Sequence, residues 1–284
     1  MAVLAQTTVT TDIAPELSID IVSELSNGYR KLAEILGVTR MDAVPEGGSI
    51  KIYKSKVKGS IGAQVGEGDV INLTEVERTA TPVTMALKKY RKLVTAEAIQ
   101  KSGRENAIYD TDRALISAIR KDVKADFFTY IATAGGTATA GTNLQTQLAN
   151  NWSALQVYFE DEDVEPVHFV NPADVATYLG SATISTQNAF GFSYVEDFLG
   201  LGTVIIANGV TAGNVISTAK ENLHCAYVPA NGALGAEFEL TADESGLVGI
   251  THDRVNDRAS IGSLMMTGVK FFAEDLLGVF KGTF

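Results

Sequence analysis

The chain has 284 residues, of which 45% are hydrophobic and 20% are charged, and this composition is typical of a globular protein with one large or two modest domains. Its formal net charge of −11 argues against a protein that grips nucleic acid through the phosphates, since that binding requires clustered Lys and Arg. The single cysteine, Cys225, excludes an intrachain disulfide framework, and no stretch has the apolar length of a membrane span or signal peptide. These features predict a soluble protein that is made in the cytoplasm.

An amphipathic helix is predicted over residues 12–36. Pro15 suits the first turn of a helix, and Gly37 suits the position after the last turn. The stripe fits either a helix that faces the core of its own chain or an arm that docks on a neighbouring subunit, because periodicity does not separate the two. Its apolar residues recur at spacings of three or four, at Leu17, Ile21, Leu25, Tyr29, Leu32 and Leu36.

Residues 49–84 are predicted to form a long hairpin that cannot bury its own surface. Side chains alternate along residues 49–58 and along a return limb at 70–78, and a glycine-rich segment at 59–69 joins the two limbs. An isolated two-stranded ribbon is marginally stable at best in water. We therefore expect this hairpin to lie on another part of the chain or on another subunit.

Charges of opposite sign lie on the two limbs of the hairpin. Such pairs across a ladder contribute roughly 0.2 to 1 kcal/mol each, which fixes the register but supplies no core. The charged residues concerned are Lys54, Lys56, Lys58, Glu67, Asp69, Glu75 and Glu77.

After the hairpin, a strand-like stretch at 83–87 leads into a basic cluster, which consists of Lys88, Lys89, Arg91 and Lys92. The acidic remainder of the chain favours a solvated or inter-subunit face over an anion site for this cluster.

Next, a long helix is predicted over 110–134, with the side chains of Asp110, Thr111 and Asp112 as its N-terminal caps. At 1.5 Å per residue it would span about 36 Å, enough to cross a domain.

A glycine pair, Gly135-Gly136, and a linker of small residues after it predict a domain boundary. The chain is expected to return to the first domain from Glu237 onwards, so the fold class is α+β with an interrupted first domain. The segments expected after the boundary are helices at 146–159 and 173–179 and strands at 167–170, 203–207, 215–217, 224–228, 237–240, 261–272 and 276–280.

Residues typical of catalytic and metal sites are few and scattered. His168, His224 and His252 are too dispersed for a metal site, and Cys225 is expected to be a buried small hydrophobe. His252 followed by Asp253 fits a base and its orienter, but a structural hydrogen bond is the simpler interpretation. The sequence contains no phosphate-binding loop, dinucleotide fingerprint or nucleophile elbow. We therefore predict no enzyme activity, no catalytic residue, no cofactor and no metal.

Four stretches, taken in order, resemble the major capsid protein of tailed bacteriophages, which has the Hong Kong ninety-seven-type fold. Each is a pattern of an architecture, and their order and spacing make the set specific. They read DIAPELSIDIVSEL at 12–25, VHFVNPADVATYL at 167–179, FLGLGTVIIANGV at 198–210 and GITHDRVNDRASIGSLMMTGVKFFAEDLLGVF at 249–280.

The resemblance covers nearly the whole chain and implies its division into four parts. These are an N-terminal arm at 1–37, an extended loop at 49–84 that lies over the adjacent subunit, a peripheral domain at 38–48, 85–142 and 230–284 with a spine helix at 110–134, and an inserted axial domain at 143–229. The charged hairpin residues named above would then contact a neighbouring subunit.

The function that the resemblance implies is self-assembly, as pentamers and hexamers, into an icosahedral shell that encloses packaged double-stranded DNA. It also implies a portal protein, a separate scaffolding protein or none, no membrane partner, and a location in the virion after synthesis in the cytoplasm of a host bacterium. Some members of the family cross-link a hairpin lysine to a neighbour's asparagine; here Lys54, Lys56 or Lys58 with Asn256 are the candidates, with Lys58 and Asn256 as the pair named. The alternatives are an encapsulin-like compartment that holds a cargo enzyme and a soluble hydrolase with an unrecognised site.

Overall fold

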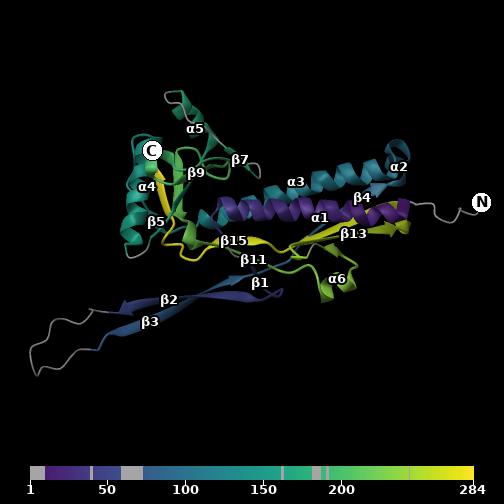
Figure 1. Ribbon diagram of the computed structural model, residues 1–284, viewed down its shortest axis with the longest axis horizontal. Helices are drawn as coiled ribbons and strands as arrows, with labels where there is room; N and C mark the ends of the chain where they lie inside the picture. The colour runs from purple at the N-terminus through teal and green to yellow at the C-terminus, as the bar shows by residue number, and fades with distance from the viewer. Residues whose placement is uncertain are drawn as a thin grey trace, which may run out of the picture.

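In the computed structural model, two long helices lie along one side of a layer of β-strands, and a two-stranded ribbon projects on the other side (Figure 1). The structure describes residues 10–38, 41–58, 73–160, 163–180, 187–189, 192–242 and 244–284. The fold is α+β, as predicted. The helices are α1 (Thr10–Ile35), α2 (Ala96–Ser102), α3 (Arg104–Ile131), α4 (Leu144–Tyr158), α5 (Pro172–Leu179) and α6 (Ala233–Glu237), with 3-10 turns η1 (Phe198–Gly200), η2 (Lys220–Asn222) and η3 (Asn256–Arg258).

The described strands form four sheets. Three strands follow the order β1 (Met41–Ala43), β11 (Leu223–Tyr227) and β15 (Lys270–Ala273). Four follow the order β12 (Thr241–Ala242), β13 (Val248–Val255), β14 (Ser260–Thr267) and β4 (Lys88–Thr95). The ribbon pairs β2 (Ser49–Lys58) with β3 (Glu75–Thr84). The largest sheet runs β5 (Gly136–Thr137), β16 (Phe280–Thr283), β10 (Asn214–Ala219), β6 (Pro166–Val170), β9 (Thr203–Ile206), β8 (Phe192–Val195) and β7 (Gln187–Ala189).

Strand pairing crosses the division of the chain that the resemblance implies. The C-terminal strand β16 pairs with β10 and β5, so the end of the chain completes the large sheet. In turn, β11 pairs with β1 and β15, so this strand joins the N-terminal and C-terminal parts of the chain. The proposed domains are therefore linked by hydrogen-bonded strands, and their boundaries stay a prediction.

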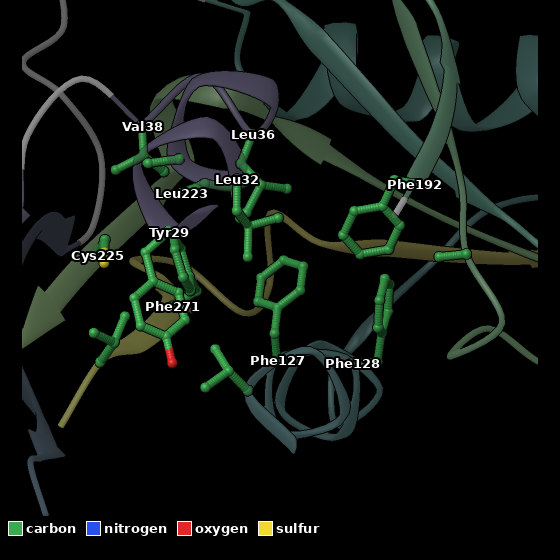
Figure 2. Packing of buried hydrophobic residues seen from close by; sticks show 14 of the residues in the cluster. Tyr29, Leu32, Leu36, Val38, Phe127, Phe128, Phe192, Leu223, Cys225 and Phe271 are labelled. Carbon is green, nitrogen blue, oxygen red and sulfur yellow. The ribbon is translucent and has the colours of Figure 1, made fainter. Parts of the chain in front are cut away.

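The second half of α1 packs into the core of its own chain. Leu25 and Tyr29 have no exposed surface, and Leu32 is 2% exposed. Figure 2 shows the α1 side chains facing Phe127 of α3 and Phe271 of β15, and these two rings lie 6.4 Å apart in an edge-to-face arrangement. Of the two alternatives for the apolar stripe, the core-facing helix describes this half of α1, and a detached arm does not.

Replacing Leu25 with alanine tests this packing. We expect a loss of about 2 to 5 kcal/mol in the free energy of unfolding of the unassembled subunit, because the substitution opens a cavity in a fully buried site. Urea unfolding with the exposed Asn27→Ala as control, for which a change within about 0.5 kcal/mol is expected, measures this. Equal stabilities of the two variants would place α1 outside the subunit core.

The long helix α3 begins six residues earlier than predicted. It starts at Arg104, directly after Gly103, whose positive φ of 81° turns the chain out of α2. Asp112 is therefore no helix cap: its side chain lies inside the fold with no exposed surface. The sequence interpretation failed because aspartate suits a helix start and a buried ion pair alike.

Four predicted strands near the hairpin and the C-terminal end were wrong in their bounds or type. The return limb β3 begins at Glu75, and residues 70–72 of the predicted limb lie outside the described residues. The segment 237–240 is the end of α6 and a turn in which Glu239 has a φ of 48°, and 276–279 precedes β16 as a loop. The predicted strand at 261–272 breaks at Gly268, where a Cβ atom would lie 2.6 Å from Val228.

Candidate functional site

The β2–β3 ribbon is anchored at its base and unsupported beyond it. Ile52 and Val83 are 7% and 4% exposed and pack in a cluster with Met85 and Phe272. Farther out, Tyr53, Val57 and Val76 are 49%, 38% and 60% exposed. The ribbon therefore projects from the body of the subunit (Figure 1), and these three apolar side chains are exposed. The strand β2 has the predicted bounds, 49–58.

Opposite charges face each other along the ribbon. Lys58 pairs in register with Glu75 and Lys56 with Glu77. The Lys58 Nζ and a Glu75 carboxylate oxygen lie 3.5 Å apart, with both side chains more than 60% exposed, so this pair contributes well under about 1 kcal/mol. Lys54 lies opposite Thr79. Two pairs of opposite charge thus lie in register across the ribbon. Their effect on the register and the contact with a neighbour stay predictions.

The remaining predicted contact residues are not brought together within one subunit. Glu67 and Asp69 lie outside the described residues. Asn256 belongs to η3, in the turn between β13 and β14, whereas Lys58 ends β2 at the outer part of the ribbon. These two segments lie at opposite ends of the molecule (Figure 1). A Lys58–Asn256 cross-link would therefore join two subunits, and it stays a prediction.

The basic cluster on β4 divides between two faces of the strand. Lys88 faces α3, where its Nζ lies 2.6 Å from a carboxylate oxygen of Asp122 and also contacts Asp126. Tyr90 donates a 2.5 Å hydrogen bond to Asp122. Lys89 and Arg91 alternate to the exposed face. The expectation of a solvated or inter-subunit face is therefore wrong for Lys88, whose contacts join β4 to α3. It is also wrong for Lys92, whose side chain is 14% exposed and pairs with the buried Asp112.

A buried ion group, which the sequence analysis did not find, joins β4, α3 and β13. Asp112 lies between Lys92, whose Nζ is 2.7 Å from Oδ1, and His252, whose Nε2 is 2.9 Å from Oδ2. Burial acts to raise the pKa of the Asp112 carboxyl, but the contacts with His252 and Lys92 outweigh it and hold the pKa below its usual value. The structural interpretation of His252 is confirmed, with Asp112 rather than Asp253 as its partner.

A second buried polar group lies in the large sheet. The Asn151 amide donates to Ser217 Oγ at 2.8 Å, and Ser217 Oγ lies 2.7 Å from Nδ1 of His168. The carbonyl of Leu201 lies 3.0 Å from Nε2, so Nε2 carries the ring proton and Nδ1 accepts from Ser217. Burial lowers the pKa of His168 to about 4, which keeps the ring neutral. The role of this histidine is structural.

The described residues offer little for catalysis or metal binding. Cys225 is 1% exposed, as predicted for a small buried hydrophobe, and burial raises the pKa of its thiol. His224 contacts Glu274 at 2.9 Å. Within the described ranges, no group of three or more His, Cys, Asp or Glu side chains is placed to hold a metal ion. No helix in that part of the chain is long and apolar enough to cross a membrane.

This chain matches known proteins by its structure but not by its sequence. No protein-family model and no curated protein matches this sequence. A structure of Gordonia phage Cozz matches with a TM-score of 0.57 and 13% identity, over 89% of this chain and 86% of its own. The capsid of a native GTA particle matches with a TM-score of 0.56 and 12% identity, over 89% of both chains. This chain has a phage-capsid fold. The Hong Kong ninety-seven-type resemblance is thus confirmed at the level of fold.

The same fold also occurs in a protein compartment. The holo-SrpI encapsulin complex from Synechococcus elongatus PCC 7942 matches with a TM-score of 0.52 and 9% identity, over 86% of this chain and 84% of its own. Identities this low establish the shared fold alone.

Proposed function

We propose that the chain is a major capsid protein that assembles, through pentamers and hexamers, into a closed icosahedral shell around packaged double-stranded DNA. The observation that carries this proposal is the ribbon, which leaves a subunit with a complete core and exposes apolar side chains at Tyr53, Val57 and Val76. A ribbon of this kind gains stability by lying on a partner. A neighbouring copy of the same chain supplies that partner repeatedly in a symmetric shell.

The rest of the proposal follows from the role in a tailed-phage head. The subunit would be made in the cytoplasm of a host bacterium and would assemble either with a separate scaffolding protein or without one. The shell would contain a portal protein at one vertex and would become part of the virion. The charged residues of the ribbon would adjust its contact with the adjacent subunit. No step in this role requires a catalytic residue or cofactor.

An encapsulin-like compartment is the second candidate, because the SrpI encapsulin shares the fold. Both candidates need the ribbon to close a shell, so they differ in the contents rather than in the assembly. Nuclease-resistant DNA inside particles from the natural source favours the capsid, and a folded cargo enzyme inside them favours the compartment.

Shortening the ribbon tests the assembly role that both candidates share. Because Lys54 lies opposite Thr79, residues 55–78 can be replaced by an Asn-Gly turn that joins these paired positions. The buried base at Ile52 and Val83 remains. We expect a folded subunit with a melting temperature within a few degrees of the wild type and no closed shells by negative-stain microscopy.

The control for this variant is the unmodified chain, prepared in the same buffer and with the same scaffolding protein where one is needed. Closed shells from the shortened chain would contradict the role of the ribbon as an inter-subunit clasp. Loss of the folded subunit, seen by circular dichroism, would instead show that the ribbon belongs to the core.

A further inference from the structure

An apolar surface lies where α4 ends beside the edge of the large sheet. Val157 and Leu277 are 73% and 60% exposed, and Tyr158 is 42% exposed. The carboxylate of Asp275 accepts hydrogen bonds from the Tyr158 hydroxyl and, at 2.9 Å, from the Leu277 amide, so it places these two residues side by side. Exposed apolar side chains that gather in one place mark an interaction surface. We call this surface the α4 corner, and it consists of Val157, Tyr158, Glu160, Asp275 and Leu277.

The α4 corner has an acidic rim. Glu160 is exposed two residues after Tyr158, and Asp275 lies beside Tyr158 itself. The C-terminal end of α4 adds the negative end of a helix dipole, and no basic residue lies in its last turn. A surface that fits this corner therefore offers apolar walls and a cation.

A cavity of about 640 Å³ beside α3 has both features. Most of its wall is apolar, and no described residue that lines it is acidic. Lys124 is engaged within the wall, where its Nζ lies 4.5 Å from the centroid of the Phe192 ring. Lys121, one turn earlier on α3, is exposed and brings a positive charge to the same cavity. We call it the α3 cavity, and its walls include Lys121, Ala125, Phe128, Pro172, Phe192 and Ile206.

The α4 corner and the α3 cavity lie toward opposite edges of the large sheet. The corner adjoins β16, because the rings of Tyr158 and Phe280 pack edge to face with their centroids 5.7 Å apart. The cavity is lined by Phe192 of β8 and Ile206 of β9, and the strands β10 and β6 lie between β16 and β9. Figure 1 shows α4 and β5 on one side of this sheet and β7 on the other. The corner of a subunit therefore does not fill the cavity of the same subunit.

We infer that the α4 corner of one subunit docks in the α3 cavity of the next subunit of the same pentamer or hexamer. Val157 and Leu277 pack against the apolar walls of the cavity, and the acidic rim of the corner lies near Lys121. Two different surfaces at opposite edges of a subunit make a head-to-tail contact, which closes into a ring. The inference deepens the proposed function and rests on it for the ring of identical subunits. It gives each subunit a contact that the ribbon does not use.

An exchange of charge between the two surfaces tests the ionic part of this contact. Lys121→Glu and Glu160→Lys are each expected to lower the yield of closed particles about tenfold at a fixed subunit concentration, because like charges then meet across the contact. The double variant Lys121→Glu/Glu160→Lys restores the attraction and should recover most of the yield. Both positions are exposed, so the unassembled variants should melt as the wild type does. A double variant that assembles no better than the single variants overturns the pairing of these two surfaces.

Cysteine cross-linking of assembled particles tests the contact directly. The native Cys225 is 1% exposed, so the introduced cysteines are the ones that react. We expect Val157→Cys/Ala125→Cys particles, treated with a short bis-maleimide and boiled in detergent, to give a ladder of covalent oligomers that ends at pentamers and hexamers. Glu97→Cys/Ala125→Cys is the matched control and should stay monomeric, because Glu97 is exposed on α2 at the far end of α3 from the cavity (Figure 1).

Closed particles of Val157→Cys/Ala125→Cys that give no ladder overturn the inference alone, and so does an equal ladder from the control. Covalent dimers from Val157→Cys or Ala125→Cys by itself also overturn it, because a two-fold contact would then bring like residues together. Shell formation by the same proteins is scored separately by microscopy. Open rings that give the expected ladder, with no closed shells from the wild type, overturn the capsid role alone.

Discussion

Replacing Asp112 with alanine is expected to destabilise the subunit by about 3 kcal/mol or more, because a buried ion pair would lose one partner. Asp112 has no exposed surface, and Lys92 is 14% exposed on its side chain. Without the carboxylate, the Lys92 ammonium would keep contacts only to neutral oxygens such as the carbonyl of Ile108, at 2.9 Å. That loss exceeds the effect of any ion pair on the described surface.

Urea unfolding of Asp112→Ala against Asp257→Ala measures this effect. Asp257 pairs with Arg258 at 3.9 Å with both side chains at least 70% exposed, so its removal should cost well under about 1 kcal/mol. Adding Lys92→Met to Asp112→Ala should restore part of the stability, since no unpaired charge is then buried. Similar costs for the two aspartate variants would show that Asp112 is not a structural anchor.

Acidification from pH 7.5 to pH 4.5 is expected to remove most of about 3 kcal/mol of stability that His168 contributes as a neutral ring. The folded pKa of about 4 lies below the unfolded value of 6.5, so the unfolded state binds the proton first as the pH falls. The contribution is complete above pH 6.5 and is lost between that pH and about pH 4. Asp112 contributes in a lower window, because its pKa is also depressed and an unfolded carboxyl titrates near about 3.9.

The variant that isolates His168 is His168→Gln, which keeps hydrogen-bonding groups near Ser217 and Leu201 but does not titrate in this range. Its free energy of unfolding at pH 7.5 is expected to be lower than that of the wild type, and its decline towards pH 4.5 shallower by about 2 to 3 kcal/mol. Parallel curves for the two proteins would exclude His168 as the source of the acid sensitivity.

Local patterns in the sequence were enough for the elements whose signals lie within a few residues. The alternation over residues 49–58 marks β2, and Asn171 before Pro172 marks α5, where the Asn171 side chain accepts a 2.9 Å hydrogen bond from the amide of Ala173. The sequence also predicted the apolar stripe of α1, but it did not indicate whether this stripe packs on the core of its own chain or on a neighbouring subunit. Whether Leu25 faces its own core or a neighbour depends on where α3 lies.

The polar groups in the core were missed for a related reason. Lys92, Asp112 and His252 lie up to 160 residues apart in sequence. They meet because β14 pairs with β4 on one side and with β13 on the other, and α3 covers this sheet.

The periodicity and composition of the chain sufficed for its α+β class, its long helices and the first strand of its projecting ribbon, because hydrophobic spacing reports the geometry of a single element. Which charges are buried in pairs, which lysines line a cavity and which face of the ribbon lacks a partner were settled by packing between elements. Such contacts depend on the arrangement of segments far apart in the chain, and no local spacing encodes that arrangement.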